Sequence, residues 1–192
     1  MKPASLILAS QSPRRRELLR RIRREFAVEP CPIPEPQTPP AADRAAAWAE
    51  SQAYFKAAAV AETHRGCWVL GADTIVTCDG SILGKPADIH DARRMLTLQA
   101  GRPSEVITGI ALLRIADETT RVVDHEITRV WMRDDPAFIL SYLQSERWRG
   151  KAGAYGIQDA GDALIDRIDG SFDNVVGLPT ERLTRLFEEL GI

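Results

Sequence analysis

The chain is poor in cysteine and carries no large excess of charge of either sign. Its three cysteines, Cys31, Cys67 and Cys78, form no CxxC pair and no cluster with histidine, so we expect neither a disulfide framework nor a structural zinc site. Lysine and arginine number 25 against 27 aspartate and glutamate residues, which gives a net charge of −2. Because no basic field covers the molecule, we do not expect it to bind long nucleic acid.

Long hydrophobic runs are absent as well. No apolar stretch approaches the roughly 20 residues that span a membrane, and arginines follow the short run at residues 6–9 instead of preceding it, unlike in a signal peptide. We therefore expect a cytoplasmic protein with no membrane partner. With 44% hydrophobic and 27% charged residues, the 192-residue chain has the composition of a soluble globular protein, and we expect residues 1–192 to form one domain, or one domain with two lobes.

Alternating strand and helix signals predict an α/β fold with a mixed, twisted sheet and flanking helices. The expected strands are 5–9, 68–77, 81–83, 106–115, 121–132 and 163–168, and the expected helices are 14–24, 43–62, 88–99, 136–146 and 179–190. Ser12 is a natural N-cap for the first helix, with Pro13 at its first position. The proline-rich stretch 30–40 predicts an extended connection.

The turn after the first strand is the first candidate site. Ser10, Ser12, Arg14 and Arg15 surround the start of a predicted helix, where unpaired N–H groups and the helix dipole favour an anion such as phosphate. The alternative is an ordinary helix with solvated arginines. The sequence GxxxxGK[ST] is absent, so this is not a Walker loop.

Asp73 and Lys85 are the next candidates. A carboxylate within the apolar strand 69–76 is costly to bury unless it is paired, hydrogen-bonded or bound to a metal, and such carboxylates are enriched at functional sites. Lys85 lies between a glycine and a proline and could hold a phosphate as a point charge, although a surface lysine in a turn is the plainer interpretation. The three histidines show no triad and no metal spacing.

Taken together and in order, the motifs resemble those of the Maf (septum formation inhibitor) family. The N-terminal motif is Ser10-x-Ser12-Pro13-Arg14-Arg15, followed by Gly71-Ala72-Asp73-Thr74, Gly84-Lys85-Pro86, Lys151-Ala152-Gly153-Ala154-Tyr155-Gly156-Ile157-Gln158 and Asn174-Val175-Val176-Gly177-Leu178-Pro179. The resemblance implies a fold similar to inosine triphosphate pyrophosphatases, with two lobes around a central cleft. It also implies a nucleoside triphosphate pyrophosphatase that uses a divalent cation, Mg²⁺ or Mn²⁺.

The resemblance also implies roles for individual residues. Asp73 would be the catalytic carboxylate and a metal ligand, Glu35 would be a second metal ligand, and Ser10, Arg14, Arg15 and Lys85 would hold the phosphates. Subgroups of the family differ at three motif positions, and Arg14, Thr74 and Gln158 match the branch that acts on dTTP and UTP. The amide of Gln158 can both donate and accept hydrogen bonds, which suits a uracil or thymine edge. Modified pyrimidine nucleotides would fit the same site.

One departure keeps alternatives open. The family's second helix usually carries a lysine where this alignment places Gln52, and Lys56 lies one turn further along the same face. A nucleotide-binding regulator of cell division with weak or no turnover is therefore an alternative. A pyrophosphatase with another base preference, such as 7-methyl-GTP, is a second alternative. The expected partner is the nucleotide substrate, and a homodimer is one assembly that we consider.

Overall fold

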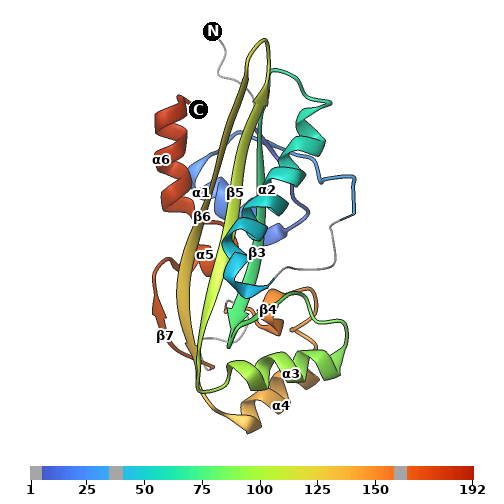
Figure 1. The fold of residues 1–192 in the computed structure, drawn as a ribbon, viewed down its shortest axis with the longest axis vertical. Helices are drawn as coiled ribbons and strands as arrows, with labels where there is room; N and C mark the ends of the chain where they lie inside the picture. The colour runs from blue at the N-terminus through green and yellow to red at the C-terminus, as the bar shows by residue number, and fades with distance from the viewer. Residues whose placement is uncertain (1–5, 35–40, 158–163) are drawn as a thin grey trace.

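A computed structural model describes residues 6–34, 41–157 and 164–192. The molecule is elongated, and three long strands run along it: β3 (Trp68–Cys78), β5 (Pro103–Ile115) and β6 (Thr119–Met132) (Figure 1). The shorter strands are β1 (Leu6–Leu8), β2 (Ala27–Val28), β4 (Ser81–Leu83) and β7 (Ile165–Asp169). Together they form one seven-stranded sheet in the order β2-β1-β3-β5-β6-β7, with β4 paired to β3.

The sheet is mixed, as the sequence predicts. Strand β1 runs parallel to β2 and β3, whereas β3, β5, β6 and β7 pair with their neighbours in antiparallel fashion. The hairpin from β5 to β6 turns at residues 116–118, as expected from the polar residues there. A parallel first unit followed by an antiparallel meander explains why the sequence shows one strand–helix unit before the long hairpins.

The helices follow the predicted pattern closely. They are α1 (Pro13–Ile22), α2 (Ala45–Ala61), α3 (Ile89–Gln99), α4 (Pro136–Gln144), α5 (Phe172–Val176) and α6 (Thr180–Leu190), with short 3₁₀ turns η1 (Ala42–Arg44) and η2 (Ala152–Ala154). The side chain of Ser12 accepts a hydrogen bond from the backbone N–H of Arg15 and confirms the predicted cap. Strand β2 and helix α5 were not predicted because segments of two and five residues are too short to show a periodicity.

Two glycines let α2 lie directly on the sheet. A Cβ atom on Gly71 would lie 2.0 Å from the carbonyl oxygen of Ala53, and one on Gly109 would lie 2.3 Å from the backbone of Ala49. Both contacts are shorter than any real Cβ contact, so only glycine fits at these positions of β3 and β5. The alanines of α2 complete this close packing, and the helix thereby brings its polar side chains to the surface of the sheet.

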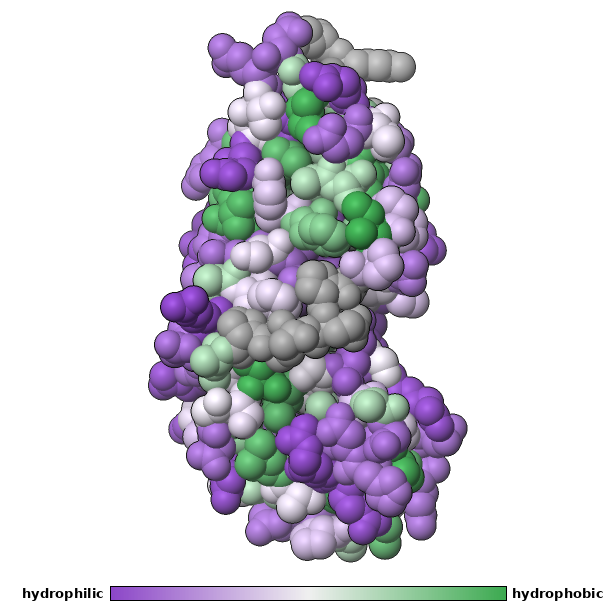
Figure 2. Space-filling model, turned by 45° about the vertical axis from the view of Figure 1, so that its right-hand side comes forward, coloured by the Kyte–Doolittle hydropathy of each residue, from purple (hydrophilic) through white to green (hydrophobic). Residues whose placement is uncertain are grey.

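The opposite face of the sheet carries the larger core. Leu18 and Leu19 of α1 and Leu183 and Phe187 of α6 are buried there against strand residues such as Leu70. Helices α3 and α4 cover the other end of the molecule (Figure 1). The outline of the molecule narrows on the right-hand side of Figure 2. In the described part of the chain, no helix has both the length and the apolar character needed to cross a membrane.

One edge of β3 has a gap that the rest of the fold surrounds. On that side β1 pairs only as far as Leu70, and β4 begins to pair only at Val76. Within the described residues, positions 71–75 of β3 therefore have a strand partner only on their other side, where β5 lies. Since β1 ends and α1 begins at this gap, the fold leaves a crevice at the carboxyl end of a parallel strand, where ligands commonly bind in α/β sheets.

Candidate active site

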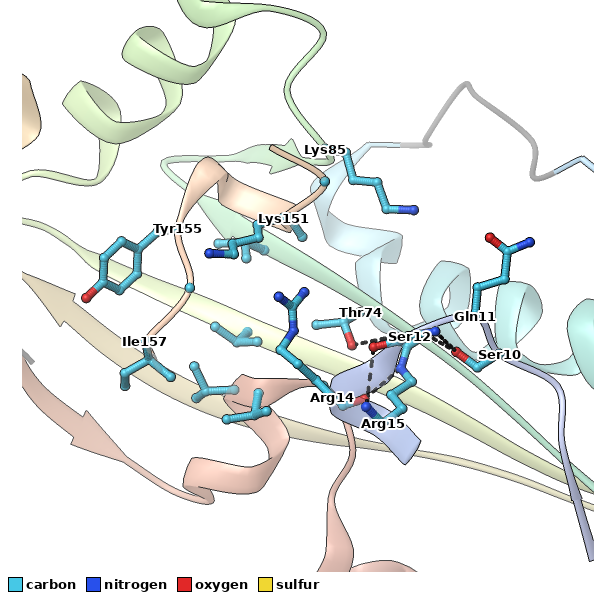
Figure 3. Close-up of a pocket in the computed structure, with 18 of the residues that line it drawn as sticks. Ser10, Gln11, Ser12, Arg14, Arg15, Thr74, Lys85, Lys151, Tyr155 and Ile157 are labelled. Atoms are coloured by element: carbon cyan, nitrogen blue, oxygen red, sulfur yellow. Dashed lines mark hydrogen bonds between the residues drawn. The ribbon is translucent and has the colours of Figure 1, made fainter. Parts of the chain in front are cut away.

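A cavity of about 730 Å³ opens beside this gap. Its wall combines the turn before α1, the segment 31–34, one residue of α2, strand β3, the loop after β4, the loop at 150–157 and the end of α5. Figure 3 shows Ser10, Arg14, Arg15, Thr74, Lys85 and Lys151 around it, from elements far apart in the sequence. A cavity of this size and polarity can hold a small charged ligand.

Arg15 ties the first turn of α1 to the sheet. Its Nε donates to the carbonyl of Gly177 (2.9 Å), its Nη2 donates to Thr74 Oγ1 (2.9 Å), and its Nη1 donates to Ser10 Oγ (3.4 Å). Ser10 Oγ also accepts a hydrogen bond from the backbone N–H of Ser12 (3.2 Å). Ser10 thus serves as acceptor to two protein donors, and its own proton can be donated to a ligand.

Thr74 belongs to a chain of hydroxyl groups behind the cavity wall. Thr108 Oγ1 donates to the carbonyl of Asn174 (3.1 Å), and the hydroxyls of Thr74 and Thr108 lie 2.9 Å apart. Because Thr108 has a single proton and gives it to Asn174, Thr74 is the donor between the two threonines. Thr74 can therefore offer a ligand only an acceptor.

Asp73 is held by a lysine from the helix across the sheet. Lys56 Nζ lies 2.6 Å from Asp73 Oδ1, and the two side chains are only 7% and 14% exposed. Asp73 points toward α2 and Thr74 toward the other face, since neighbouring strand residues alternate. Lys56 lines the cavity, whereas Asp73 lies one ion pair behind its wall. The gap at the edge of β3 is what allows groups from both faces to reach one site.

Three further cations line the cavity: Arg14, Lys85 and Lys151. The side chain of Lys151 is buried, and its Nζ lies 3.5 Å from the hydroxyl of Tyr142. Burial lowers the pKa of Lys151 to about 8, and the nearby charges of Arg14 and Arg147 contribute to this. A buried lysine facing two arginines favours an anionic ligand, which would offset the repulsion among the cations.

Most of the predicted site residues meet at this cavity. Ser10, Arg14, Arg15, Thr74 and Lys85 line it, and Asp73 lies next to Thr74. Glu35 and Gln158 lie outside the described residues, so their predicted roles stay predictions.

The structure revises one assignment and adds residues. The cation that pairs with Asp73 comes from Lys56 of α2 and not from position 52. Gln52 is buried and does not line the cavity, and its Oε1 has no hydrogen-bond partner among the described residues. A glutamine at position 52 therefore does not leave Asp73 without a cation from α2. Gln99 and Ser104 also line the cavity and were not predicted. Their spacing in sequence carries no motif. The pairing of β5 with its neighbours places Ser104, and hydrogen bonds to Ser104 and to the carbonyl of Gly153 hold Gln99, at the end of α3, beside it.

One oxygen of the Asp73 carboxylate remains able to bind a cation. In the ranges 6–34, 41–157 and 164–192, no three His, Cys, Asp or Glu side chains cluster as a metal site. Asp73 Oδ2, unlike Oδ1, accepts no hydrogen bond from these residues. One carboxylate oxygen together with substrate phosphates is a common way to bind Mg²⁺, which keeps several waters. The free side of the Asp73 carboxylate can therefore serve as one ligand of a divalent cation.

The chain is similar to known proteins over nearly its whole length. The model of the Maf-like protein family matches residues 5–190. The dTTP/UTP pyrophosphatase of Oleidesulfovibrio alaskensis is 44% identical over 94% of this chain and 83% of its own length. The dTTP/UTP pyrophosphatase of Koribacter versatilis is 42% identical over 97% of this chain and 95% of its own. The solved structure of a HAM1 protein from Coxiella burnetii covers 97% of this chain and 100% of its own, with a TM-score of 0.54 at 16% identity, and shares the fold.

Proposed function

Because the chain belongs to the family of Maf-like proteins, we propose that it is a nucleoside triphosphate pyrophosphatase that hydrolyses dTTP and UTP to the monophosphate and pyrophosphate. Relatives that are more than 40% identical over nearly the whole chain carry this activity in their names. The observation that carries the proposal is the Lys56–Asp73 pair, in which Lys56 lines a cavity rich in cations and Asp73 lies directly behind it.

The phosphates fit the cationic end of the cavity. Ser10 offers its hydroxyl proton, and the start of α1 adds the positive end of a helix dipole. Arg14 and Lys85, which line the cavity, add positive charge to it. Arg15 is committed to Gly177 and Thr74, so its main role is to hold the turn in place while its charge adds to the field.

Asp73 then acts on the attacking water. Its Oδ2 accepts a proton from, or orients, a water molecule whose oxygen attacks the α-phosphorus. The new bond joins that oxygen to the α-phosphorus, and the bond from the α-phosphorus to the α–β bridging oxygen breaks. Pyrophosphate leaves with the electron pair, and positive side chains stabilise the charge that develops on it. Lys56 keeps Asp73 in position through Oδ1.

A divalent cation, Mg²⁺ or Mn²⁺, would be held by Asp73 together with the substrate phosphates and would neutralise phosphate charge. Glu35 is our proposed second ligand. For the base, Arg14, Thr74 and Gln158 support the preference for dTTP and UTP, and modified pyrimidine triphosphates would enter the same site. We also propose a cytoplasmic location, where nucleoside triphosphates are abundant, and a homodimer as the assembly to test by light scattering.

A nucleotide panel tests the proposal. The protein is incubated with dTTP, UTP, CTP, ATP, GTP, ITP and 7-methyl-GTP in Mg²⁺ or Mn²⁺, and pyrophosphate is scored separately from phosphate. We expect pyrophosphate from dTTP and UTP first, and loss of activity in EDTA that added metal restores. Release of phosphate alone, or a preference for 7-methyl-GTP or ITP, would contradict the proposed activity or its base preference.

A further inference from the structure

The cavity continues well beyond its cationic end, along one face of the sheet. On this face the pairing of β3 with β5 aligns Thr74 with Thr108 and Val76 with Val106, and Ser104 comes next on β5. Val130 of β6 lies opposite Ser104. Ser104 lies four positions before Thr108 on β5, which is roughly 13 Å at about 3.3 Å per residue. The floor of the cavity thus extends from Thr74 across valines to Ser104.

The far end of the cavity combines apolar side chains with a deeply buried polar pair. Val106, Val130, Met132, Ile157 and Ile165 line it, and Figure 3 shows Ile157 and Tyr155 on the loop that forms its wall. The polar pair is Gln99, at the end of α3, and Ser104, at the start of β5; they are 4% and 3% exposed. Polar side chains buried this deeply are costly unless their hydrogen bonds are made, so their bonding pattern shows what they can still offer.

The hydrogen bonds of Gln99 determine which way its amide faces. Nε2 donates to the carbonyl of Met95 (3.0 Å) and to the carbonyl of Gly153 (2.8 Å). Two carbonyl acceptors require the NH₂ group on that side, so Oε1 faces Ser104. Ser104 Oγ donates to Oε1 at 3.4 Å, a long and weak hydrogen bond. All protons of the pair are used, and what remains for a ligand is acceptor capacity only.

We propose that Gln99 and Ser104 recognise the base of the nucleotide by accepting a hydrogen bond from N3–H of uracil or thymine. This inference rests on the proposed function, because it places the triphosphate at the cationic end and the base at the apolar end. An aromatic base gains from burial against the valines, and its one ring N–H finds the acceptor pair. Cytosine has no hydrogen on N3, so it lacks the ring N–H donor that uracil and thymine offer at this position.

The energetic consequence follows from the burial of the pair. A site built to accept a hydrogen bond discriminates against a ligand that lacks the donor, because buried acceptors then lose a partner. One such hydrogen bond corresponds to about tenfold in kcat/KM. The pair therefore contributes to base selection in addition to Arg14, Thr74 and Gln158. Its two residues lie outside the motifs of the N-terminal turn and the 151–158 segment.

The test compares UTP with N3-methyl-UTP, in which a methyl group replaces the N3 hydrogen. The wild-type protein should use UTP at least about tenfold better than N3-methyl-UTP. In the variant Gln99→Leu the preference should nearly vanish because turnover of UTP falls, and Ser104→Ala should reduce it in part. Gln144→Leu and Ser81→Ala, at exposed positions, are matched controls and should keep the wild-type preference.

A purely structural role for the pair has a different signature. If Gln99 only holds the loop at Gly153, Gln99→Leu will lower kcat/KM for both nucleotides by the same factor, and this result overturns the inference. An unchanged preference for UTP over N3-methyl-UTP in folded Gln99→Leu and Ser104→Ala also overturns the inference. If Gln99→Leu does not fold, an unchanged preference in Ser104→Ala alone overturns it. Calorimetry with UMP and N3-methyl-UMP makes the same comparison without turnover, so failure of the proposed activity is distinguished from failure of base recognition.

Discussion

Breaking the Lys56–Asp73 pair should separate stability from catalysis. At 2.6 Å and an effective dielectric constant of about 20, two unit charges attract by roughly 6 kcal/mol, and part of this offsets the desolvation of the two groups. Removing one partner of a buried pair typically costs about 3–5 kcal/mol. Because Asp73 is 14% exposed, we expect the lower end, about 3 kcal/mol, for Lys56→Met.

The expected shift is large enough to measure in thermal unfolding. In a protein of 192 residues, a loss of about 3 kcal/mol lowers Tm by roughly 6–12 °C. Asp73→Asn should also lower Tm, since it leaves Lys56 without this carboxylate. Its turnover should fall about 10²–10⁴-fold, as is typical when general base catalysis is lost.

The double variant Lys56→Met/Asp73→Asn provides the sharpest result. With both charges removed, it should be more stable than the sum of the single losses predicts, yet as inactive as Asp73→Asn. As a control, Asp79→Asn breaks the exposed pair with Arg102 and should change the free energy of unfolding by less than about 0.5 kcal/mol. Near-normal turnover in a folded Asp73→Asn protein would refute the catalytic role, and additive stability losses would refute the coupling.

Other perturbations test the remaining parts of the site and the fold. Because Lys151 loses its positive charge above its pKa of about 8, kcat/KM for UTP should fall as the pH rises through this value. The variant Lys151→Arg should keep a flat pH profile. A wild-type profile that is flat as well would contradict the role of the Lys151 charge in binding the nucleotide. Gly109→Ala places a methyl group 2.3 Å from the backbone of α2 and should cost about 3 kcal/mol in urea unfolding, whereas Gly84→Ala, which meets no atom within 4 Å, should cost far less. Gln158→Glu should lower turnover of UTP and dTTP more than that of purine triphosphates, and equal losses in a nucleotide panel would count against its role in base selection.

The elements of this fold could be predicted where local physics decides them. Ser12 caps α1 because its side chain can accept from Arg15 N–H whatever the rest of the chain does. The long apolar strands and the polar turn between β5 and β6 likewise depend on residues close in sequence. Helix α5 escaped prediction because it is stabilised by distant contacts, with the side chain of Asn174 donating to Val106 and Thr128.

The candidate site divides in the same way. From the sequence alone, the motif residues Ser10, Arg14, Asp73 and Lys85 could be recognised as cations, hydroxyls and a carboxylate suited to phosphate and metal chemistry. The residue of α2 that faces Asp73 could not be predicted from the sequence, because Gln52 and Lys56 lie on one helical face. Only the position of the helix on Gly71 and Gly109 selects Lys56 as the partner of Asp73.

The chain by itself determined which elements form and which chemical groups they carry, because propensity, capping and hydrophobic pattern act over a few residues. Only the tertiary structure decided how these groups meet. The early end of β1 and the late start of β4 open the edge of β3, so that Asp73 and Thr74, on opposite faces, serve one cavity. The register of β5 then places Ser104 beside Gln99 at its far end. Such meetings depend on contacts between residues far apart in sequence, and no local pattern encodes their distances.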